Sequence, residues 1–207
     1  KNKLSDNTKR FTGAANASFK IADWWDVSAR VGYDQYTTEA YTYIAPGSVA
    51  KEMYQNGRLN KSDYTYNYIS TNVMSNFHKT FGDFDLNLLV GTTTESTERH
   101  NQTHWGYDFI TAGTIISKEN QFFKDATSKK RLVGVYGEFR ASYKNIAYLT
   151  VTGRNDWSST LPIDNRSYFY PSVSGSFVFT ELFSKNDILT FGKVRASWAQ
   201  VGKDANA

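Results

Sequence analysis

The chain has 207 residues, of which 24 are basic and 20 are acidic, so its formal net charge is +4. No cluster of Lys and Arg accompanies this weak bias, and nucleic-acid binding is therefore not predicted. The longest apolar runs are little more than triplets, such as Leu88-Leu89-Val90, whereas a membrane-spanning helix needs about 20 consecutive apolar residues. The absence of cysteine excludes a disulfide scaffold, a thiolate zinc site and a cysteine nucleophile.

Two features of the composition point to a β-rich protein. Aromatic residues make up 16% of the chain, and there are only three prolines. The mean hydropathy is −0.55, which is polar on average. Many aromatic residues in a polar chain with little proline favour strands that carry aromatic side chains on their surface.

Apolar and polar residues begin to alternate near the amino terminus. Over residues 11–21 the odd positions are apolar or small and the even positions are mostly polar, and the pattern repeats over residues 25–33. A period of two predicts strands with one apolar and one polar face. A long polar stretch, roughly 35–64, is interpreted as a connection with turn signals at Pro46-Gly47 and Asn56-Gly57.

The middle of the chain predicts a second hairpin. A less regular strand over about 65–79 and a strand over 84–91 flank a tight turn at Gly82-Asp83. A second long polar stretch, about 95–130, is again interpreted as a connection. Alternation resumes over 133–143 and 147–154, on either side of a turn at Lys144-Asn145.

The last part of the chain predicts two further strands. A medium loop over about 155–166 precedes a strand near 168–179, and a short connection at 181–187 leads to a last strand over about 188–200. The predicted connections therefore run short, long, short, long, short, medium, short. In a meander every second turn lies at the same end, so one end carries the tight turns, as in outer-membrane barrels.

The residues of the predicted faces support a membrane wall. The apolar face is rich in small residues, which lipid tolerates but a packed core does not. Aromatic residues gather near strand ends, as expected for the girdles at the two membrane interfaces. We therefore predict an all-β fold, an antiparallel up-and-down meander of about eight long strands that is a segment of a larger transmembrane β-barrel.

Two other folds stay open at this point. The chain could be a soluble β-rich carbohydrate-binding module, with a packed core beneath the apolar face. It could also be a small self-contained eight-stranded outer-membrane barrel, in which the strand at 11–21 pairs with the strand at 188–200.

Three stretches of the last third carry a resemblance to a known family. They are Leu149–Pro162, which includes Gly-Arg-Asn-Asp-Trp, then Tyr168–Leu182, and then Phe191–Lys203. In this order and spacing they resemble the mid-barrel strands of SusC/RagA-type TonB-dependent outer-membrane transporters. The earlier two-thirds fit the strand layout of the family without a motif of their own.

The resemblance implies a barrel of about 22 strands with an internal plug, in the outer membrane of a Gram-negative cell. Such a transporter imports oligosaccharide or peptide nutrients held under a SusD-like lipoprotein lid and is energised by TonB–ExbB–ExbD. Residues 1–207 would be part of one barrel domain, with both ends cut from a longer protein. The plug, the TonB box and both termini of the parent would lie outside the chain. The resemblance therefore implies the function of the parent protein, and not an activity of this segment alone.

Aromatic residues of the predicted outer loops are the ligand-contact candidates. Aromatic faces stack on sugar rings or cover apolar parts of a ligand, while polar neighbours fix its orientation. The alternative is that they pack loops together or contact the partner lid. The candidates are Tyr41, Tyr43, Trp105, Tyr107 and Trp157.

The family-like signature residues are expected to have a structural role. We expect Arg154 and Asp156 to pair and to hold a loop against the barrel wall. The structural signature comprises Arg154, Asn155, Asp156, Pro171 and Arg195.

No catalytic, metal or cofactor site is predicted, and the chain is not expected to be an enzyme. Asp83 and Asp85 flank a hairpin turn, where aspartates are common. His100 and His104 have metal-like spacing, but they lie in a predicted loop without a third ligand nearby.

Overall fold

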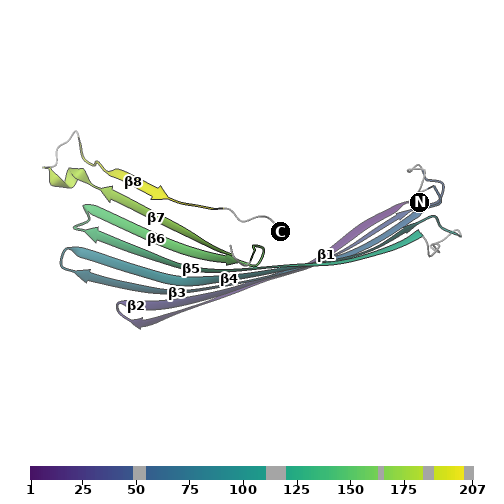
Figure 1. Cartoon of the computed structure of the whole chain (residues 1–207), viewed down its shortest axis with the longest axis horizontal. Helices are drawn as coiled ribbons and strands as arrows, with labels where there is room; N and C mark the ends of the chain where they lie inside the picture. Colours follow the sequence, from purple (N-terminus) through teal and green to yellow (C-terminus); the bar gives the residue numbers. More distant parts are fainter. Residues whose placement is uncertain (49–54, 111–119, 163–165, 184–188, 203–207) are drawn as a thin grey trace. The chain divides into compact units, whose positions relative to one another are not determined.

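The computed structural model describes residues 1–48, 55–110, 120–162, 166–183 and 189–202. These residues form one eight-stranded sheet whose strands follow their order in the chain, β1 to β8 (Figure 1). The all-β antiparallel meander predicted from the sequence is therefore confirmed. Its elements are β1 (Lys3–Ala22), β2 (Trp25–Ile44), β3 (Arg58–Phe81), β4 (Phe84–Tyr107), β5 (Gln121–Tyr143), β6 (Ala147–Ser158), β7 (Ser167–Phe177), the 3-10 helix η4 (Phe179–Leu182) and β8 (Val194–Ala199).

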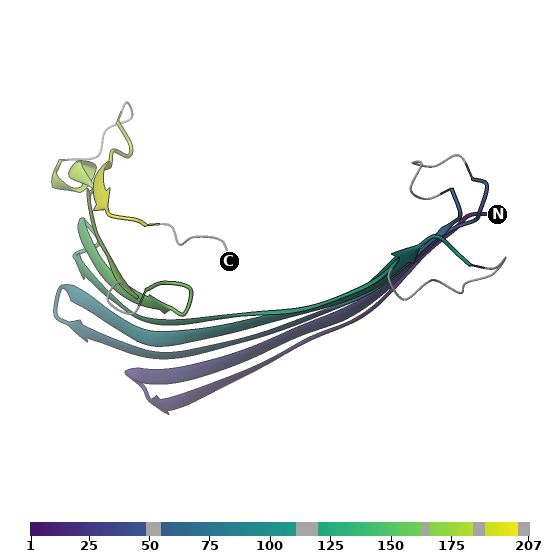
Figure 2. The same ribbon diagram turned by 45° about the vertical axis from the view of Figure 1, so that its right-hand side comes forward.

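The chain divides into two compact units. Unit 1 comprises residues 1–13, 32–69 and 96–129, and unit 2 comprises residues 14–31, 70–95 and 130–207. Unit 1 holds parts of β1 to β5. Unit 2 holds the other parts of these strands together with β6, β7 and β8, which lie beside one another in both ribbon views (Figure 2).

The tight hairpins predicted from the sequence are present in unit 2. Gly82, in the turn between β3 and β4, has a φ of 56°, which glycine adopts without steric penalty. Lys144 and Asn145 between β5 and β6 have φ values of 50° and 59°. Consecutive positive φ values match the right-handed twist of the flanking strands and give short hairpin turns.

The two long polar connections predicted from the sequence are largely wrong. β2 continues to Ile44 and β3 begins at Arg58, so most of residues 35–64 is strand. Residues 95–130 likewise contain the end of β4 and the start of β5, and β2 to β5 are 20 to 24 residues long. The prediction failed because both faces of these segments are polar, and a strand with two polar faces has no apolar period of two.

The predicted end of the chain also needs correction. β8 begins at Val194 rather than near residue 188, and the segment before it contains η4 and is longer than the predicted short connection. Leu189 and Phe191 are exposed apolar residues at odd positions, out of step with the even apolar positions Val194, Ala196 and Trp198 of the strand. Part of the predicted connection, residues 184–188, lies outside the described residues. β6 in turn continues to Ser158, so residues 155–158 belong to a strand and not to a loop.

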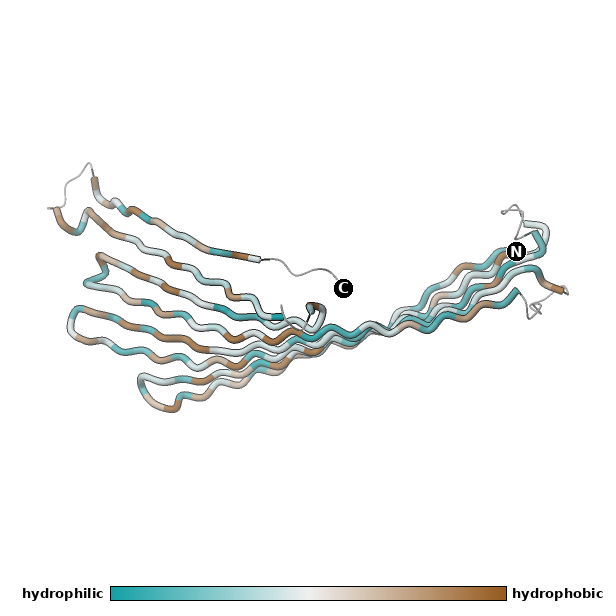
Figure 3. Tube along the Cα trace, in the orientation of Figure 1, coloured by the Kyte–Doolittle hydropathy of each residue, from teal (hydrophilic) through white to brown (hydrophobic). Residues whose placement is uncertain are grey.

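Two opposite faces of unit 2 can be followed across four strands. The paired residues Phe139, Val151, Val173 and Trp198 form one row, and the next row consists of Arg140, Thr150, Ser174 and Ser197. Directly paired residues share a face, and neighbouring positions along a strand point to opposite faces. The first row therefore marks the apolar face of unit 2 and the second row marks its polar face. Hydropathy alternates along the strands in the same way (Figure 3).

The apolar face has no second layer against it. Among the described residues only Phe109 and Val178 are buried hydrophobic side chains, and no large side chain is fully buried. A soluble sandwich packs its apolar face on another sheet, whereas the described strands form one sheet. The structure therefore does not support the soluble-module alternative.

The closed eight-stranded barrel is also wrong for this sheet. β1 and β8 stand at opposite ends of the strand order, and no pairing between them occurs in the described parts of the chain.

No helix in those same parts is long and apolar enough to cross a membrane.

A charge on the apolar face should be far more damaging than the same charge beside it on the polar face. Val151 and Thr150 are neighbours in β6 on opposite faces, and Val151 is 39% exposed. If lipid covers the apolar face, Val151→Arg should destabilise the sheet by about 2–4 kcal/mol. The measurement is the amount of folded, heat-modifiable protein in the membrane fraction of cells that express the natural full-length protein. Thr150→Arg is the matched control, and equal losses for the two variants would contradict the assignment of faces.

Candidate functional site

Three tyrosines from β2 and β3 lie together on one face of unit 1. The ring centroids of Tyr36 and Tyr66 are 4.9 Å apart with nearly parallel planes, and Tyr64 lies 5.8 Å from Tyr36. The guanidinium of Arg10 lies 5.8 Å from the Tyr36 ring, and that of Arg99 lies 5.9 Å from the Tyr66 ring. Cations at this distance from ring faces are attracted by the ring quadrupole. These five residues are called the tyrosine cluster.

Arg10 is held in place by Asp34. Its Nε donates to Asp34 Oδ1 at 2.9 Å and its Nη2 donates to Oδ2 at 2.7 Å. Thr12 Oγ1 donates to the same carboxylate at 3.0 Å. A bidentate guanidinium–carboxylate pair fixes the plane of the guanidinium. Arg10 therefore presents a defined flat surface beside the Tyr36 ring.

The same contacts change the acid–base behaviour of the cluster. The hydrogen bonds from Arg10 lower the pKa of Asp34, and this effect outweighs the opposing effect of partial desolvation. Desolvation, followed by the hydrogen bond with Tyr64, raises the pKa of Tyr36. At neutral pH the ionised Asp34 carboxylate therefore pairs with the cationic Arg10 guanidinium beside the neutral phenol of Tyr36.

A second group of aromatic residues lies on the same face of unit 1. The rings of Trp105 and Phe122 stack at 4.3 Å, and Tyr107 stacks on Phe122 at 6.1 Å. Arg58 lies 6.0 Å from the Trp105 ring. Arg58 and Tyr66 are an even number of residues apart in β3, so both groups share one face. The four residues Arg58, Trp105, Tyr107 and Phe122 are called the tryptophan cluster.

The two clusters together have the chemistry of a binding surface. Flat aromatic faces cover sugar rings or apolar side chains, and arginines beside them bind carboxylates or carbonyl oxygens. The Tyr36 and Trp105 side chains are half-buried. Because ring stacking fixes side chains in both clusters and the ion pair with Asp34 fixes Arg10, little rotamer freedom would be lost on binding.

The structure separates the predicted ligand-contact residues. Trp105 and Tyr107 belong to the tryptophan cluster, whereas Tyr41 and Tyr43 are odd-numbered residues of β2 and face away from Tyr36. The Lys3 ammonium lies 5.7 Å from the Tyr41 ring. Tyr43 stacks on Phe109 at 5.7 Å. All four lie in strands, so their predicted place in loops is wrong.

Trp157 is placed differently from the other candidates. It lies in β6, where it pairs with Val133 and Ser167 on the apolar face of unit 2, and it is 41% exposed. Its predicted position in an outer loop is therefore also wrong, because β6 continues to Ser158.

The expected pairing of Arg154 with Asp156 is present. Arg154 Nε donates to the two carboxylate oxygens at 2.7 and 2.9 Å, and Nη2 donates to Thr93 Oγ1 at 3.0 Å. Through Thr93 the pair joins β6 to β4 on the polar face of unit 2. The expectation that it holds a loop is therefore wrong. A Cβ at the intervening Gly134 would collide with the Asp156 carboxylate and the Arg154 guanidinium. Gly134 therefore provides the space for the pair.

The other signature residues lie in the sheet of unit 2. Asn155 Nδ2 donates to Ser167 Oγ at 2.9 Å, and Pro171 pairs with Gly153. Arg195 in β8 pairs with Ser176 in β7. These positions place all five signature residues in strands, and their structural role stays a prediction.

Sequence reasoning missed most of the tyrosine cluster. Tyr64, Tyr66 and Tyr68 are spaced by two, which is the spacing that places side chains on one face of a strand. Tyr36 and Arg10 carried no comparable signal, because their contacts join residues from different strands. Tyr66 and Tyr68 share a face of the strand predicted over about 65–79, whereas Tyr64 and Tyr36 fall in the stretch 35–64 that was interpreted as a connection.

The remaining candidates have ordinary partners. His100 Nε2 lies 2.7 Å from Asp125 Oδ1, and His104 Nε2 lies 3.3 Å from Gln121 Oε1. Lys144 pairs with Asp83 across the turns at 3.2 Å. Among the residues that the structure describes, no group of three or more His, Cys, Asp or Glu could hold a metal ion.

Comparisons with known proteins give one sequence match and several fold matches. No family model matches the chain. The chain is 34% identical over 77 residues to TonB-dependent receptor P26 of Formosa agariphila, and the match covers 36% of this chain and 8% of that protein. The chain is also similar to a solved structure of the RagAB peptide transporter, with a TM-score of 0.83 and 15% identity. The RagAB peptide importer in its closed-closed state gives a TM-score of 0.84 and 16% identity.

The fold matches cover nearly the whole chain but a small part of each relative. Both RagAB matches cover 96% of this chain and 23% of the matched chain. The ferric preacinetobactin receptor BauA of Acinetobacter baumannii is similar at a TM-score of 0.52 and 12% identity, over 84% of this chain and 30% of that chain.

The open sheet with one apolar and one polar face defines the chain as a stretch of β-barrel wall. The resemblance to SusC/RagA-type TonB-dependent transporters is confirmed, since the sequence match is to a TonB-dependent receptor and the fold matches are to RagAB.

The Arg10–Asp34 pair should make the tyrosine cluster sensitive to acid. Because Arg10 lowers the pKa of Asp34, the stability from this pair is complete above the unfolded value of about 3.9 and is lost as pH falls through the lower folded value. Hydrogen exchange of residues 30–40, corrected for intrinsic pH dependence, should therefore accelerate in acid. Asp34→Asn should exchange faster at neutral pH and lose this acid-dependent step. A step of equal size in the variant would show that another group titrates.

Proposed function

We propose that the chain is a wall segment of an outer-membrane active transporter that imports glycan- or peptide-type nutrients. Residues 1–207 form part of one TonB-dependent receptor barrel domain, whose plug and barrel termini lie elsewhere in the protein. The transporter works with a SusD-like surface lipoprotein and is energised through TonB–ExbB–ExbD. It is not an enzyme and needs no cofactor. It resides in the outer membrane of a Gram-negative cell.

The observation that carries this proposal is the pair of contrasting rows across β5 to β8. The row with Val151 is apolar and exposed, whereas the row with Thr150 is polar. A wall one sheet thick with these two faces suits lipid on one side and water on the other. The similarity to RagAB over 96% of the chain supports a barrel of the same type.

One face of unit 1 has the properties of a cargo surface. The tyrosine and tryptophan clusters place aromatic faces and three arginines on one face of unit 1. We assign cargo contact to these clusters, which include Trp105 and Tyr107. Tyr41, Tyr43 and Trp157 lie on the opposite faces of their strands and are not assigned to cargo. The RagAB structures are named as those of a peptide transporter, and that name makes a peptide the first cargo to test.

Uptake by the intact cell tests the proposed function. Cells that lack the gene should lose uptake of a fluorescent oligopeptide mixture or of a fluorescent oligosaccharide mixture, and the wild-type gene should restore it. A protonophore should abolish the same uptake, since TonB-driven import depends on the proton gradient. Purification of the full-length protein should recover a surface lipoprotein in a stable complex. Uptake of both mixtures that is unchanged in the deletion strain would contradict the proposal.

Loss of one cluster ring should weaken cargo binding, whereas loss of a ring on the opposite face should not. Trp105→Ala and Tyr66→Ala each remove an aromatic face from the cluster surface, and about a 5- to 10-fold rise in the half-saturation concentration for uptake is expected. Tyr41→Ala is the matched control, because it removes a tyrosine of unit 1 that faces away from the clusters. All variants should reach the membrane in equal amounts. A Tyr41→Ala effect as large as that of Tyr66→Ala would contradict the assignment.

A further inference from the structure

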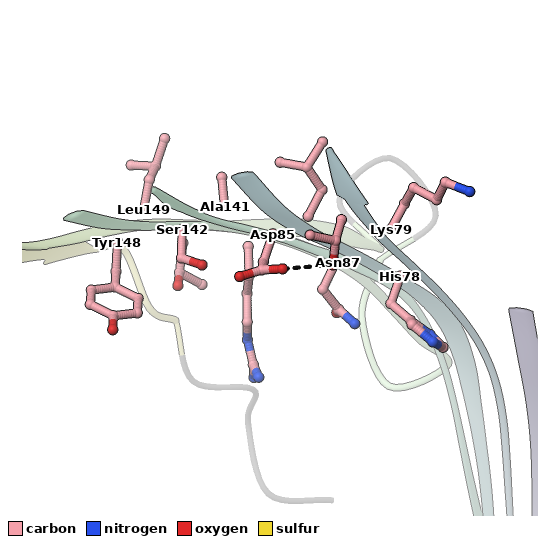
Figure 4. Close-up of a pocket in the computed structure, with 12 residues that line it drawn as sticks. His78, Lys79, Asp85, Asn87, Ala141, Ser142, Tyr148 and Leu149 are labelled. Carbon is pink, nitrogen blue, oxygen red and sulfur yellow. Dashed lines mark hydrogen bonds between the residues drawn. The ribbon is translucent and has the colours of Figure 1, made fainter. Parts of the chain in front are cut away.

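One lysine interrupts the apolar face of unit 2. Phe77 and Phe81 flank Lys79 at odd positions of β3, and such positions share a face. Lys79 points to the same side as Ala141 and Leu149 and away from His78 and Asn87 (Figure 4). At the apolar-face positions of the described strands of unit 2, the only other charged residue is Arg131, which lies in the middle of β5 and far from the short hairpin at Tyr143.

An apolar groove begins at Lys79. It has a volume of about 400 Å³ and is lined by Lys79, His78 and six apolar residues, namely Trp24, Phe77, Phe81, Leu86, Leu88 and Phe139. Phe77 is fixed by stacking on Trp25 at 5.7 Å and on Trp24 at 6.2 Å. The rings are therefore held in place by one another, and Leu86 and Leu88 extend the hydrocarbon surface along β4.

The lysine is available for an anion. Lys79 is exposed, and no ion pair to it occurs among the described residues. The nearby carboxylates are engaged elsewhere: Asp83 pairs with Lys144, and Asp85 accepts a hydrogen bond from Thr80 at 2.7 Å. Lys79 lies two residues before the end of β3, so its long side chain can bring the ammonium to the level of the hairpin turns.

We propose that this groove binds one phospholipid, with its phosphate on Lys79 and an acyl chain along Leu86, Leu88 and Phe139. The assignment rests on the proposed function, which places the apolar face in a bilayer and the short hairpins at one surface of it. A cation at one end of an apolar groove complements a ligand with an anionic head and a hydrocarbon tail. A bare lipid-facing surface requires neither the charge nor the fixed rings around it.

The test uses the full-length transporter, extracted from the outer membrane in mild detergent and examined by native mass spectrometry. Added phosphatidylethanolamine should remain bound to the wild-type protein, whereas diacylglycerol with the same acyl chains should not. Lys79→Gln should weaken phospholipid binding by about fivefold, and Lys79→Arg should retain it. Leu86→Trp, which fills the groove and leaves the lysine in place, should also lose the lipid. Lys20→Gln is the matched control, because Lys20 is an exposed lysine paired with Asp23 in the neighbouring hairpin.

Each result bears on the proposal in a defined way. Phospholipid retained equally by the wild type and Lys79→Gln would overturn it, and so would equal retention of diacylglycerol by the wild type. Phospholipid lost equally from Lys20→Gln would show a general charge effect and would overturn it too. These results leave the proposed function intact, because they are obtained on a protein already in the outer membrane. A wild-type protein absent from the outer-membrane fraction would overturn the proposed function and this inference together.

Discussion

The backbone of a single-layer sheet gives each side chain only two environments. Neighbouring strands satisfy the N–H and C=O groups, and successive side chains then point to opposite sides. In β6 this places Val151 among exposed apolar residues and Thr150 among polar ones, although they are adjacent in the chain. Every other feature of the molecule depends on this division, because no packed core among the described residues supplies a third environment.

The division also explains which parts of the fold could be predicted. Where the two environments differ, as at 133–143 and 147–154, the sequence alternates and the strands and turns were found. In unit 1 both faces are polar, so hydropathy does not alternate along the strands. Thr37 and Thr65, for example, place their Oγ1 atoms 3.5 Å apart across β2 and β3 at odd positions that are apolar in unit 2. Pairing with a neighbouring strand extends these segments into sheet, and that partner cannot be recognised from a local pattern. The strand order was predictable because consecutive strands joined by tight turns are neighbours in a sheet, and errors in strand length do not change this.

The candidate site was less predictable, because its members come together from different strands. Trp105 and Tyr107 were recognised as aromatic residues in a polar region, yet the same criterion selected Tyr41 and Tyr43 on the opposite face. A residue can be assigned to a face only when the strand that contains it has been recognised. The strand segments around Tyr41, Tyr43, Trp105 and Tyr107 were interpreted as connections, so no face could be assigned to them. The Arg154–Asp156 pair was expected from the Gly-Arg-Asn-Asp-Trp signature, although Asp156 falls in the predicted loop 155–166. Its third partner, Thr93, is 61 residues away and only the folded sheet reveals it.

The polar side of unit 2 holds side chains that interlock between neighbouring strands. On that face Gly91 and Gly134 lack a Cβ where the Tyr136 ring and the Arg154–Asp156 pair lie, so side chains of one strand fill the space above the next. Arg154 also lies 5.6 Å from the Tyr136 ring, which connects both arrangements into one network. On the apolar side of unit 2, the large residues along β5 to β8 stand 38 to 60% exposed and contact whatever surrounds the sheet. The polar network fixes the register of β4 to β6. The free energy of exposing the apolar side depends on whether water or lipid surrounds it.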